Sequence, residues 1–270
     1  MSSQKWLIQV YLMELRKMVA YRSDFWVNFI GQTAFSITLS YFLWLAIFES
    51  QDSEQIKGFS LDKIIFYYLI VPIVFRVQQG QGIGAISREI YDGSLNKFIL
   101  YPINFMFYKI TSYVAHSSFI FIQLIIITVI YYFGLNNDQS IIITLPNFLF
   151  FSLFLLLSAI TYFFMNSLVE FVAFWADNIW SLGVIIRFIT RFFGGGLIPL
   201  AFFPHWSQEA LSYTPFPYMI HFPMKVFFGE FSVVEYLNSF TILTLWSVFF
   251  SILSNLIWNK GKYQYSGVGI

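Results

Sequence analysis

Hydrophobic residues occur along this chain in six blocks, which short polar segments separate. The blocks occupy residues 25–48, 62–82, 107–133, 146–169, 178–200 and 236–258. A helix of about 20 apolar residues is long enough to cross the hydrocarbon core of a bilayer, which is about 30 Å thick. The blocks lack the alternation of polar and apolar positions that is typical of lipid-facing barrel strands. We therefore predict an all-α integral membrane protein with six transmembrane helices and both termini on one side.

The segment before the first block, residues 1–24, has a different pattern. Two neighbouring lines of apolar residues follow helical spacing: Trp6, Val10, Met13 and Ala20 on one, and Leu7, Tyr11, Leu15 and Met18 on the other. This pattern favours an amphipathic helix that lies at the membrane interface. The alternative is a helix that packs on protein.

The distribution of charge indicates the orientation. Only 11% of residues are charged, against roughly 25% in an ordinary soluble domain. Basic residues gather on the side of the termini: Lys5, Arg16, Lys17, Arg22, Arg88, Lys97, Lys260 and Lys262. The other side is acidic, with Glu49, Asp52, Glu54, Asp62, Asp138, Glu209, Glu230 and Glu235 against Lys57, Lys63 and Lys225. The positive-inside rule then places both termini in the cytoplasm.

The fifth block contains residues that break helices. Gly194, Gly195, Gly196, Pro199 and Pro204 occur within RFFGGGLIPLAFFPHW. Glycine allows backbones to approach closely, and proline removes a donor and clashes with the preceding turn. We predict a break here, followed in residues 201–235 by external re-entrant helices between spans five and six. The alternative is an ordinary external loop with an aromatic belt.

Three arginines lie inside predicted spans. Arg187 and Arg191 are four residues apart and share a helical face, and Arg76 follows Pro72 in span two. A charge within the membrane normally faces the protein interior, pairs, or reaches the interface. One hypothesis is that Arg187 and Arg191 line a translocation path and hold an anionic group. The alternatives are pairing with Glu170 or Asp177 and, for Arg76, which we favour, a span that ends early at the cytoplasmic surface.

The sequence offers little chemistry of its own. It has no cysteine, no nucleotide-binding loop of the form GxxxxGK[ST], no HExxH and no GxSxG. Gly80, Gly82 and Gly84 lack the lysine of a phosphate loop, and the three histidines are far apart. We expect no catalytic residue, no metal site, no bound cofactor and no nucleic-acid partner.

The segment ISREIYDGSLNKFILYPIN resembles the cytoplasmic coupling segment of type-2 ATP-binding-cassette (ABC) exporter permeases. Ile90, Gly93, Leu95, Leu100 and Pro102 match its pattern. Other likenesses extend over nearly the whole chain: Tyr21, Arg22, Asp24 and Phe25 at span one, Glu170, Ala173 and Trp175 between spans four and five, Gly196, Pro199, Phe203, Pro204, Pro215, Phe216, Pro223 and Gly229 after span five, and Gly261, Tyr263 and Gly267 in the tail.

This resemblance implies a single transmembrane permease domain over residues 1–270, with a coupling segment at 83–106. It implies a second permease, an identical copy or a related chain, and two ABC ATPase subunits that use ATP and Mg on separate chains. The expected location is the bacterial cytoplasmic (inner) membrane. The expected cargo is amphipathic, lipid-linked or peptide-like, and leaves the cytoplasm or the inner leaflet.

Within the coupling segment we predict a short amphipathic helix that contacts an ATPase. The candidate contact residues are Arg88, Glu89, Tyr91, Asp92 and Lys97, and Gly93 is expected to end the helix. A secondary transporter or channel that works without an ATPase is the alternative function, although the spans offer few acidic residues for a relay.

Overall fold

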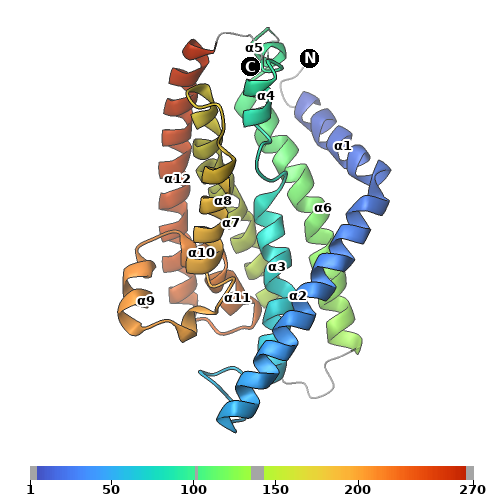
Figure 1. Cartoon of the computed structure of the whole chain (residues 1–270), viewed down its shortest axis with the longest axis vertical. Helices are drawn as coiled ribbons and strands as arrows, with labels where there is room; N and C mark the ends of the chain where they lie inside the picture. The colour runs from blue at the N-terminus through green and yellow to red at the C-terminus, as the bar shows by residue number, and fades with distance from the viewer. Residues whose placement is uncertain (1–4, 101–102, 135–142, 266–270) are drawn as a thin grey trace.

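The computed structural model describes residues 5–100, 103–134 and 143–265, and in these residues it is helical without a strand (Figure 1). Pro102, Asp138 and Gly267 lie outside the described residues. The α-helices are α1 (Lys5–Ala20), α2 (Arg22–Gln51), α3 (Leu61–Gln79), α4 (Ser87–Tyr91), α5 (Asn96–Leu100), α6 (Phe105–Gly134), α7 (Leu145–Phe171), α8 (Trp180–Phe193), α9 (His205–Ser212), α10 (Phe216–Met219), α11 (His221–Phe227) and α12 (Val233–Gln264). Two short 3₁₀ helices, η1 (Val172–Phe174) and η2 (Leu200–Phe202), join them.

Four helices in the described part of the chain are long and apolar enough to cross a membrane. They comprise Phe29–Gln51, Phe105–Phe133, Leu145–Phe174 and Val233–Gln264. These segments coincide with the first, third, fourth and sixth predicted spans. Large apolar side chains remain exposed along them, such as Phe35 on α2 and Leu245 on α12. Exposure of this kind suits contact with lipid.

The other two predicted spans differ from the expectation. Helix α3 has 19 residues but includes Asp62, Lys63 and Arg76. Helix α8 has 14 residues, which is about 21 Å at 1.5 Å per residue and shorter than the bilayer core. The predicted span of 178–200 was too long because the helix ends where the three glycines begin. The four apolar helices are therefore what the structure shows of the six predicted crossings.

Helix α3 forms the centre of the main hydrophobic core and packs against α2, α6 and α7. Its buried apolar residues include Ile64, Phe66, Tyr67, Ile70, Val71, Ile73 and Val74. The end of α3 is closed by α6, since the hydroxyls of Ser117 and Tyr113 donate to the carbonyls of Val77 and Gln78. The last carbonyls of a helix have no partner within it, so these side chains supply the missing donors.

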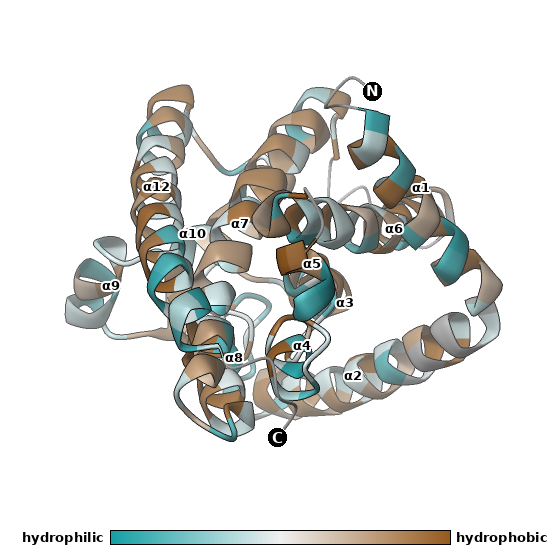
Figure 2. Cartoon of the chain, turned by 90° about the horizontal axis from the view of Figure 1, so that it is seen from above, coloured by the Kyte–Doolittle hydropathy of each residue, from teal (hydrophilic) through white to brown (hydrophobic). Residues whose placement is uncertain are grey.

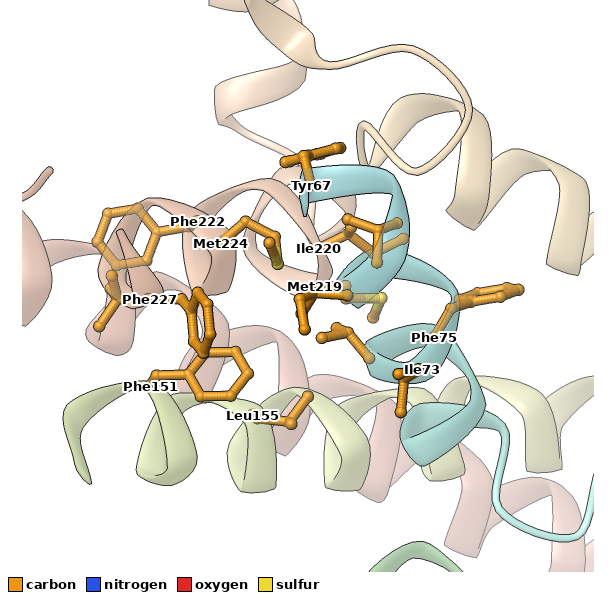
Figure 3. Packing of buried hydrophobic residues seen from close by; sticks show 14 of the residues in the cluster. Tyr67, Ile73, Phe75, Phe151, Leu155, Met219, Ile220, Phe222, Met224 and Phe227 are labelled. Carbon is orange, nitrogen blue, oxygen red and sulfur yellow. The ribbon is translucent and has the colours of Figure 1, made fainter. Parts of the chain in front are cut away.

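Residues 216–227 pack into the same core (Figure 3). Phe222 and Phe227 lie over α7, where the rings of Phe227 and Phe151 are 5.0 Å apart, and Met219 and Ile220 lie beside α3. Met219, Ile220 and Phe227 are fully buried. This proline-rich stretch is therefore short helices packed on the long ones, as its apolar composition indicates, and it is not a solvated loop.

Helix α1 packs along α6. This agrees with the alternative prediction for residues 1–24, a helix that packs on protein. The Tyr11 hydroxyl lies 2.8 Å from that of Ser118, and Glu14 is buried and ion-paired with Lys17 at 2.9 Å. The opposite face leaves Ile8 and Val19 exposed. Arg16 and Lys17 are exposed as well, so helix α1 combines a protein-facing side with an outer side of mixed polarity.

The start of α1, helices α4 and α5, and the end of α12 lie at one end of the bundle (Figure 1), and Figure 2 looks onto this end. Helices α9 to α11 lie away from it. Away from this end, Lys63 pairs with Glu230 and Lys225 with Glu235. Two of the three lysines assigned to the acidic side are therefore neutralised there.

Candidate coupling site and arginine groove

Glu170, near the C-terminus of α7, holds the turn before α4. Its carboxylate accepts hydrogen bonds from the backbone N–H groups of Gly84 (3.1 Å), Ile86 (2.6 Å) and Ser87 (2.9 Å). The Asn166 amide donates to the same carboxylate at 2.9 Å, and Glu170 is only 1% exposed. The first N–H groups of a helix lack internal partners, so a buried carboxylate is well placed to bind them. Glu170 fixes the start of α4 to the end of α7.

Glu89 of α4 faces inward. Its carboxylate lies 2.8 Å from the ammonium group of Lys109 on α6 and 3.8 Å from that of Lys97. Lys109 is 5% exposed and also donates to the carbonyl of Ala85 at 2.6 Å. Glu89 therefore ties α4 to α6, whereas the sequence suggested it as an outward contact. Lys109 was not singled out from the sequence, because a single lysine at the start of an apolar helix gives no signal of its partner.

The turn between α4 and α5 is built from local bonds. Gly93 follows α4 with a φ of 75°, a conformation that glycine adopts readily, and the Leu95 N–H donates to the Glu89 carbonyl at 2.9 Å. The predicted single helix is thus two five-residue helices with Gly93 between them. Asp92 accepts from the Ser94 N–H at 2.9 Å, and hydrogen bonds from the side chain and backbone of Ser94 lower the pKa of Asp92.

Tyr91 joins this turn to the segment after α7. Its hydroxyl donates to the Ala176 carbonyl at 3.0 Å. Partial burial, together with the nearby charge of Asp177, raises the pKa of Tyr91. The tyrosine therefore keeps its proton and its hydrogen bond near neutral pH.

The inner side of the coupling segment is apolar and the outer side is mixed. Ile90, Leu95 and Phe98 are buried in a second hydrophobic cluster with Phe105 and Phe171. The outer side exposes Arg88, Asp92, Asn96, Lys97, Ile99 and Leu100. Leu100 is 81% and Ile99 51% exposed. We call this set the outer face of α4–α5. Of the six predicted residues, only Arg88, Asp92 and Lys97 are exposed on it.

The end of α12 supports the coupling segment from the side. The ring of Trp258 stacks on that of Phe105 with centroids 4.4 Å apart. Gly261 lies where a Cβ would come within 2.1 Å of the Phe174 ring. Close packing at this end therefore joins α4, α5, α6, η1 and α12 into one unit.

A groove of about 750 Å³ lies between α2, α3 and α8. Arg187 and Arg191 of α8 and Arg76 of α3 all line it, so we call it the arginine groove. The Arg76 guanidinium is 5.5 Å from the ring centroid of Phe29 and that of Arg191 is 5.9 Å from that of Phe75. Helix α3 ends three residues past Arg76, at Gln79, and the early end of this span at the cytoplasmic surface stays a prediction. The sequence singled out all three arginines but proposed only Arg187 and Arg191 for the path, and the structure places Arg76 beside the same groove.

Within the described residues, neither Arg187 nor Arg191 pairs with a carboxylate. Glu170 is occupied by backbone N–H groups, as described above, and Asp177 lies exposed beyond α7. The Nε atoms of both arginines are buried and have no hydrogen-bond acceptor there. The structure therefore does not show the pairing with Glu170 or Asp177 that the sequence left open.

The break after α8 is held by two tyrosines of α3. The Tyr67 hydroxyl donates to the Gly195 carbonyl at 2.8 Å, and that of Tyr68 donates to the Leu197 carbonyl at 2.7 Å. Gly194, Gly195 and Gly196 are buried, Pro199 is buried before η2, and Pro204 is exposed at the start of α9. The broken backbone is thus satisfied by protein groups, as unpaired backbone at membrane depth requires.

Comparison with protein-family models gives one match that spans most of the chain. The model described as "ABC-2 family transporter protein" matches residues 34–269. This range contains α3 to α12, the outer face of α4–α5 and the arginine groove's three arginines. Neither the search of curated proteins nor that of solved structures gave a match. The chain belongs to the ABC-2 family of transporter proteins, the permeases of ABC transporters.

Proposed function

We propose that this chain is the transmembrane permease subunit of an ATP-driven ABC exporter and that an ATPase subunit binds the outer face of α4–α5. The proposal rests mainly on the way this face is attached to the membrane helices. It is exposed and mixed in charge on the outside, while inside it is bonded to α7 through Glu170 and to α6 through Lys109. A contact that transmits force has to be rigidly joined to the membrane helices, and this one is.

In the proposed arrangement the chain crosses the membrane six times, with α3 and α8 as the second and fifth crossings. The end that carries α4 and α5 faces the cytoplasm of a bacterial cell, and both termini lie there. The basic residues at that end support this orientation. Residues 201–235 re-enter the outer leaflet and cover the outer end of the path.

Two copies of the permease, or this chain and a related one, work on two ATPase subunits. The ATPases bind ATP and Mg, and this chain binds no cofactor itself. Arg88, Asp92 and Lys97 contact the ATPase directly. Glu89, Tyr91 and Gly93 hold the shape of the contact from within.

Closure of the ATPases on ATP moves α4 and α5. Because Glu89 is paired with Lys109 and the turn before α4 is bonded to Glu170, the displacement passes to α6 and α7. Rigid elements that shift against one another then alter the path beside α2, α3 and α8. Arg187 and Arg191 line that path, through which an amphipathic, lipid-linked or peptide-like cargo leaves the cytoplasm or inner leaflet.

Purification of the chain from its native membrane tests the proposal. An ATPase subunit should be recovered with it, and reconstituted liposomes should move cargo with Mg-ATP and stop when Mg²⁺ is withheld. Transport by the isolated chain without ATP would contradict the proposal and favour a secondary transporter or channel.

A further inference from the structure

We infer that the arginine groove binds an amphiphile with a phosphate headgroup and an alkyl chain. This inference rests on the proposed function, because it names the class of cargo for the proposed path. Three features support it: the charges of Arg187 and Arg191, the lack of an acidic residue among the described lining residues, and the apolar walls on either side.

The groove is cationic, and no acidic side chain lines it among the described residues. Arg187 and Arg191 line it without an ion-paired carboxylate in the described part of the chain. A cation in apolar surroundings is costly unless an anion or strong acceptors compensate it. The buried Nε atoms of Arg187 and Arg191 have no acceptor in the described residues. Both side chains line the groove, so an anion bound there would compensate their charge.

The chemistry of the cations selects the kind of anion. Guanidinium groups form paired hydrogen bonds to phosphate and carboxylate oxygens, and they keep their charge in apolar surroundings. Arg187 and Arg191 are one helical turn apart on α8, about 6 Å along its axis. A headgroup with several oxygens, such as a phosphate, can contact both arginines, whereas a single carboxylate has only two oxygens to share.

The walls of the groove fit an alkyl chain. Phe35, Leu39 and Leu43 of α2 lie on one side and Phe188 of α8 on the other, and each is more than half exposed: 67%, 56%, 58% and 58%. An apolar surface of this kind beside the cations accommodates a tail next to its headgroup. The volume of about 750 Å³ is within the range of small-molecule sites, roughly 300–1,000 Å³.

Polar side chains complete the site without adding negative charge. Gln32 and Ser36 of α2 and Gln79 of α3 line the groove. Amide and hydroxyl groups can donate to the remaining phosphate oxygens. A cationic amphiphile would meet the like charges of Arg187 and Arg191 and no carboxylate among the described lining residues, so the groove should reject it.

Binding to the purified full-length chain in a neutral maltoside detergent tests the inference, with no ATPase or ATP present. The probes are dodecyl phosphate, dodecyltrimethylammonium and inorganic phosphate, and binding is followed by native mass spectrometry and by the shift in thermal unfolding. We expect wild-type protein to bind dodecyl phosphate at least tenfold more tightly than either other probe. This comparison between headgroups needs no variant.

The double variant Arg187→Gln/Arg191→Gln should weaken dodecyl phosphate binding at least tenfold, whereas Arg16→Gln, at an exposed position on α1, should leave it unchanged. The charge-preserving Arg187→Lys/Arg191→Lys should retain binding even if the glutamine variant does not fold. Equal binding of the cationic probe, equal binding of inorganic phosphate alone, or undiminished binding by a folded glutamine variant would overturn the inference. Because no ATPase takes part, these outcomes are independent of the co-purification test above.

Discussion

At the residue scale, Glu170 is the most informative single position. Its buried carboxylate accepts hydrogen bonds from three backbone N–H groups. Loss of these bonds would leave buried polar groups without partners, which lowers the stability of the fold. It joins two segments that are more than 80 residues apart in sequence. In the proposed function Glu170 positions the coupling segment, and the ATPase does not have to touch it.

Replacing Glu170 with Gln should release the turn before α4. The amide offers one acceptor oxygen in place of two and adds a donor that faces N–H groups. We therefore expect the free energy of unfolding to fall by about 1–3 kcal/mol. The midpoint of thermal unfolding should fall, and limited proteolysis should cut within residues 84–100 sooner. Glu209→Gln is the control, since that side chain is 73% exposed. Equal midpoints and equal cleavage for the two variants would contradict this role.

The Lys109–Glu89 pair makes a second prediction, because each partner compensates the other's charge beneath α4. Lys109→Met and Glu89→Gln should each destabilise the protein, and the double variant should lose less than the sum of the two. A coupling of about 0.5–3 kcal/mol is expected for residues in direct contact. Unfolding midpoints of the four proteins complete the cycle. Additive losses would mean that the ion pair contributes nothing in solution.

The sequence could not predict these inward bonds. Glu89 and Asp92 look equivalent in the linear pattern, as two acids in one polar segment. Only the packing of α6 beside α4 makes Glu89 a partner of Lys109 while Asp92 stays exposed. The helix-ending role of Gly93 was predictable, because glycine readily adopts the positive φ that often follows the last turn of a helix.

At the element scale, the break after α8 shows that local glycines and prolines determine where a helix ends. The glycines and prolines predicted an end to the helix, and α8 does end at Phe193. The length of α8 was overestimated because Leu197, Ile198 and Leu200 are as apolar as a helix in lipid. Leu200 is buried in the protein and Leu197 is half-buried, whereas Ile198 is exposed. Hydropathy alone cannot distinguish a residue packed on protein from one that continues a helix in lipid.

Gly195→Ala tests whether this break is held in one geometry. Gly195 has a φ of 88°, and an added Cβ would lie 2.9 Å from Leu200 Cδ1 and 3.3 Å from the Tyr67 hydroxyl. We expect backbone strain in the alanine variant to lower the free energy of unfolding by about 1–3 kcal/mol. Gly31→Ala is a matched control, because nothing lies within 4 Å of a Cβ there and α2 is helical. A helical alanine there should be neutral or stabilise by about 0.5–1 kcal/mol. Similar unfolding midpoints for both variants would refute the constraint.

At the scale of the whole molecule, the helical class, the membrane-spanning character and the family were predictable from the sequence. Long apolar blocks and short polar segments decide the class by length alone. The arrangement around α3 was not predictable, because its charged residues and Pro72 make it resemble a poorer span than α6 or α7. The arginine groove likewise depends on α2, α3 and α8 lying together.

The orientation can be tested with introduced thiols, since the chain contains no cysteine. Glu54→Cys, in the segment between α2 and α3, should react with a membrane-impermeant maleimide in intact cells. Lys97→Cys and Tyr263→Cys should react only after the membrane is opened, because α5 and the end of α12 lie at the end that we propose to face the cytoplasm. Labelling of Lys97→Cys from outside would invert the proposed orientation.

The central claim is that an ATPase binds the outer face of α4–α5. The most direct test is site-specific photo-crosslinking in the native membrane. A photoreactive amino acid replaces Arg88 in one protein and Lys57, at an exposed position between α2 and α3, in the other. We predict a covalent adduct with a chain that carries a nucleotide-binding loop from position 88 and none from position 57. Failure of position 88 to reach such a chain, or equal adducts from both positions, would contradict the account.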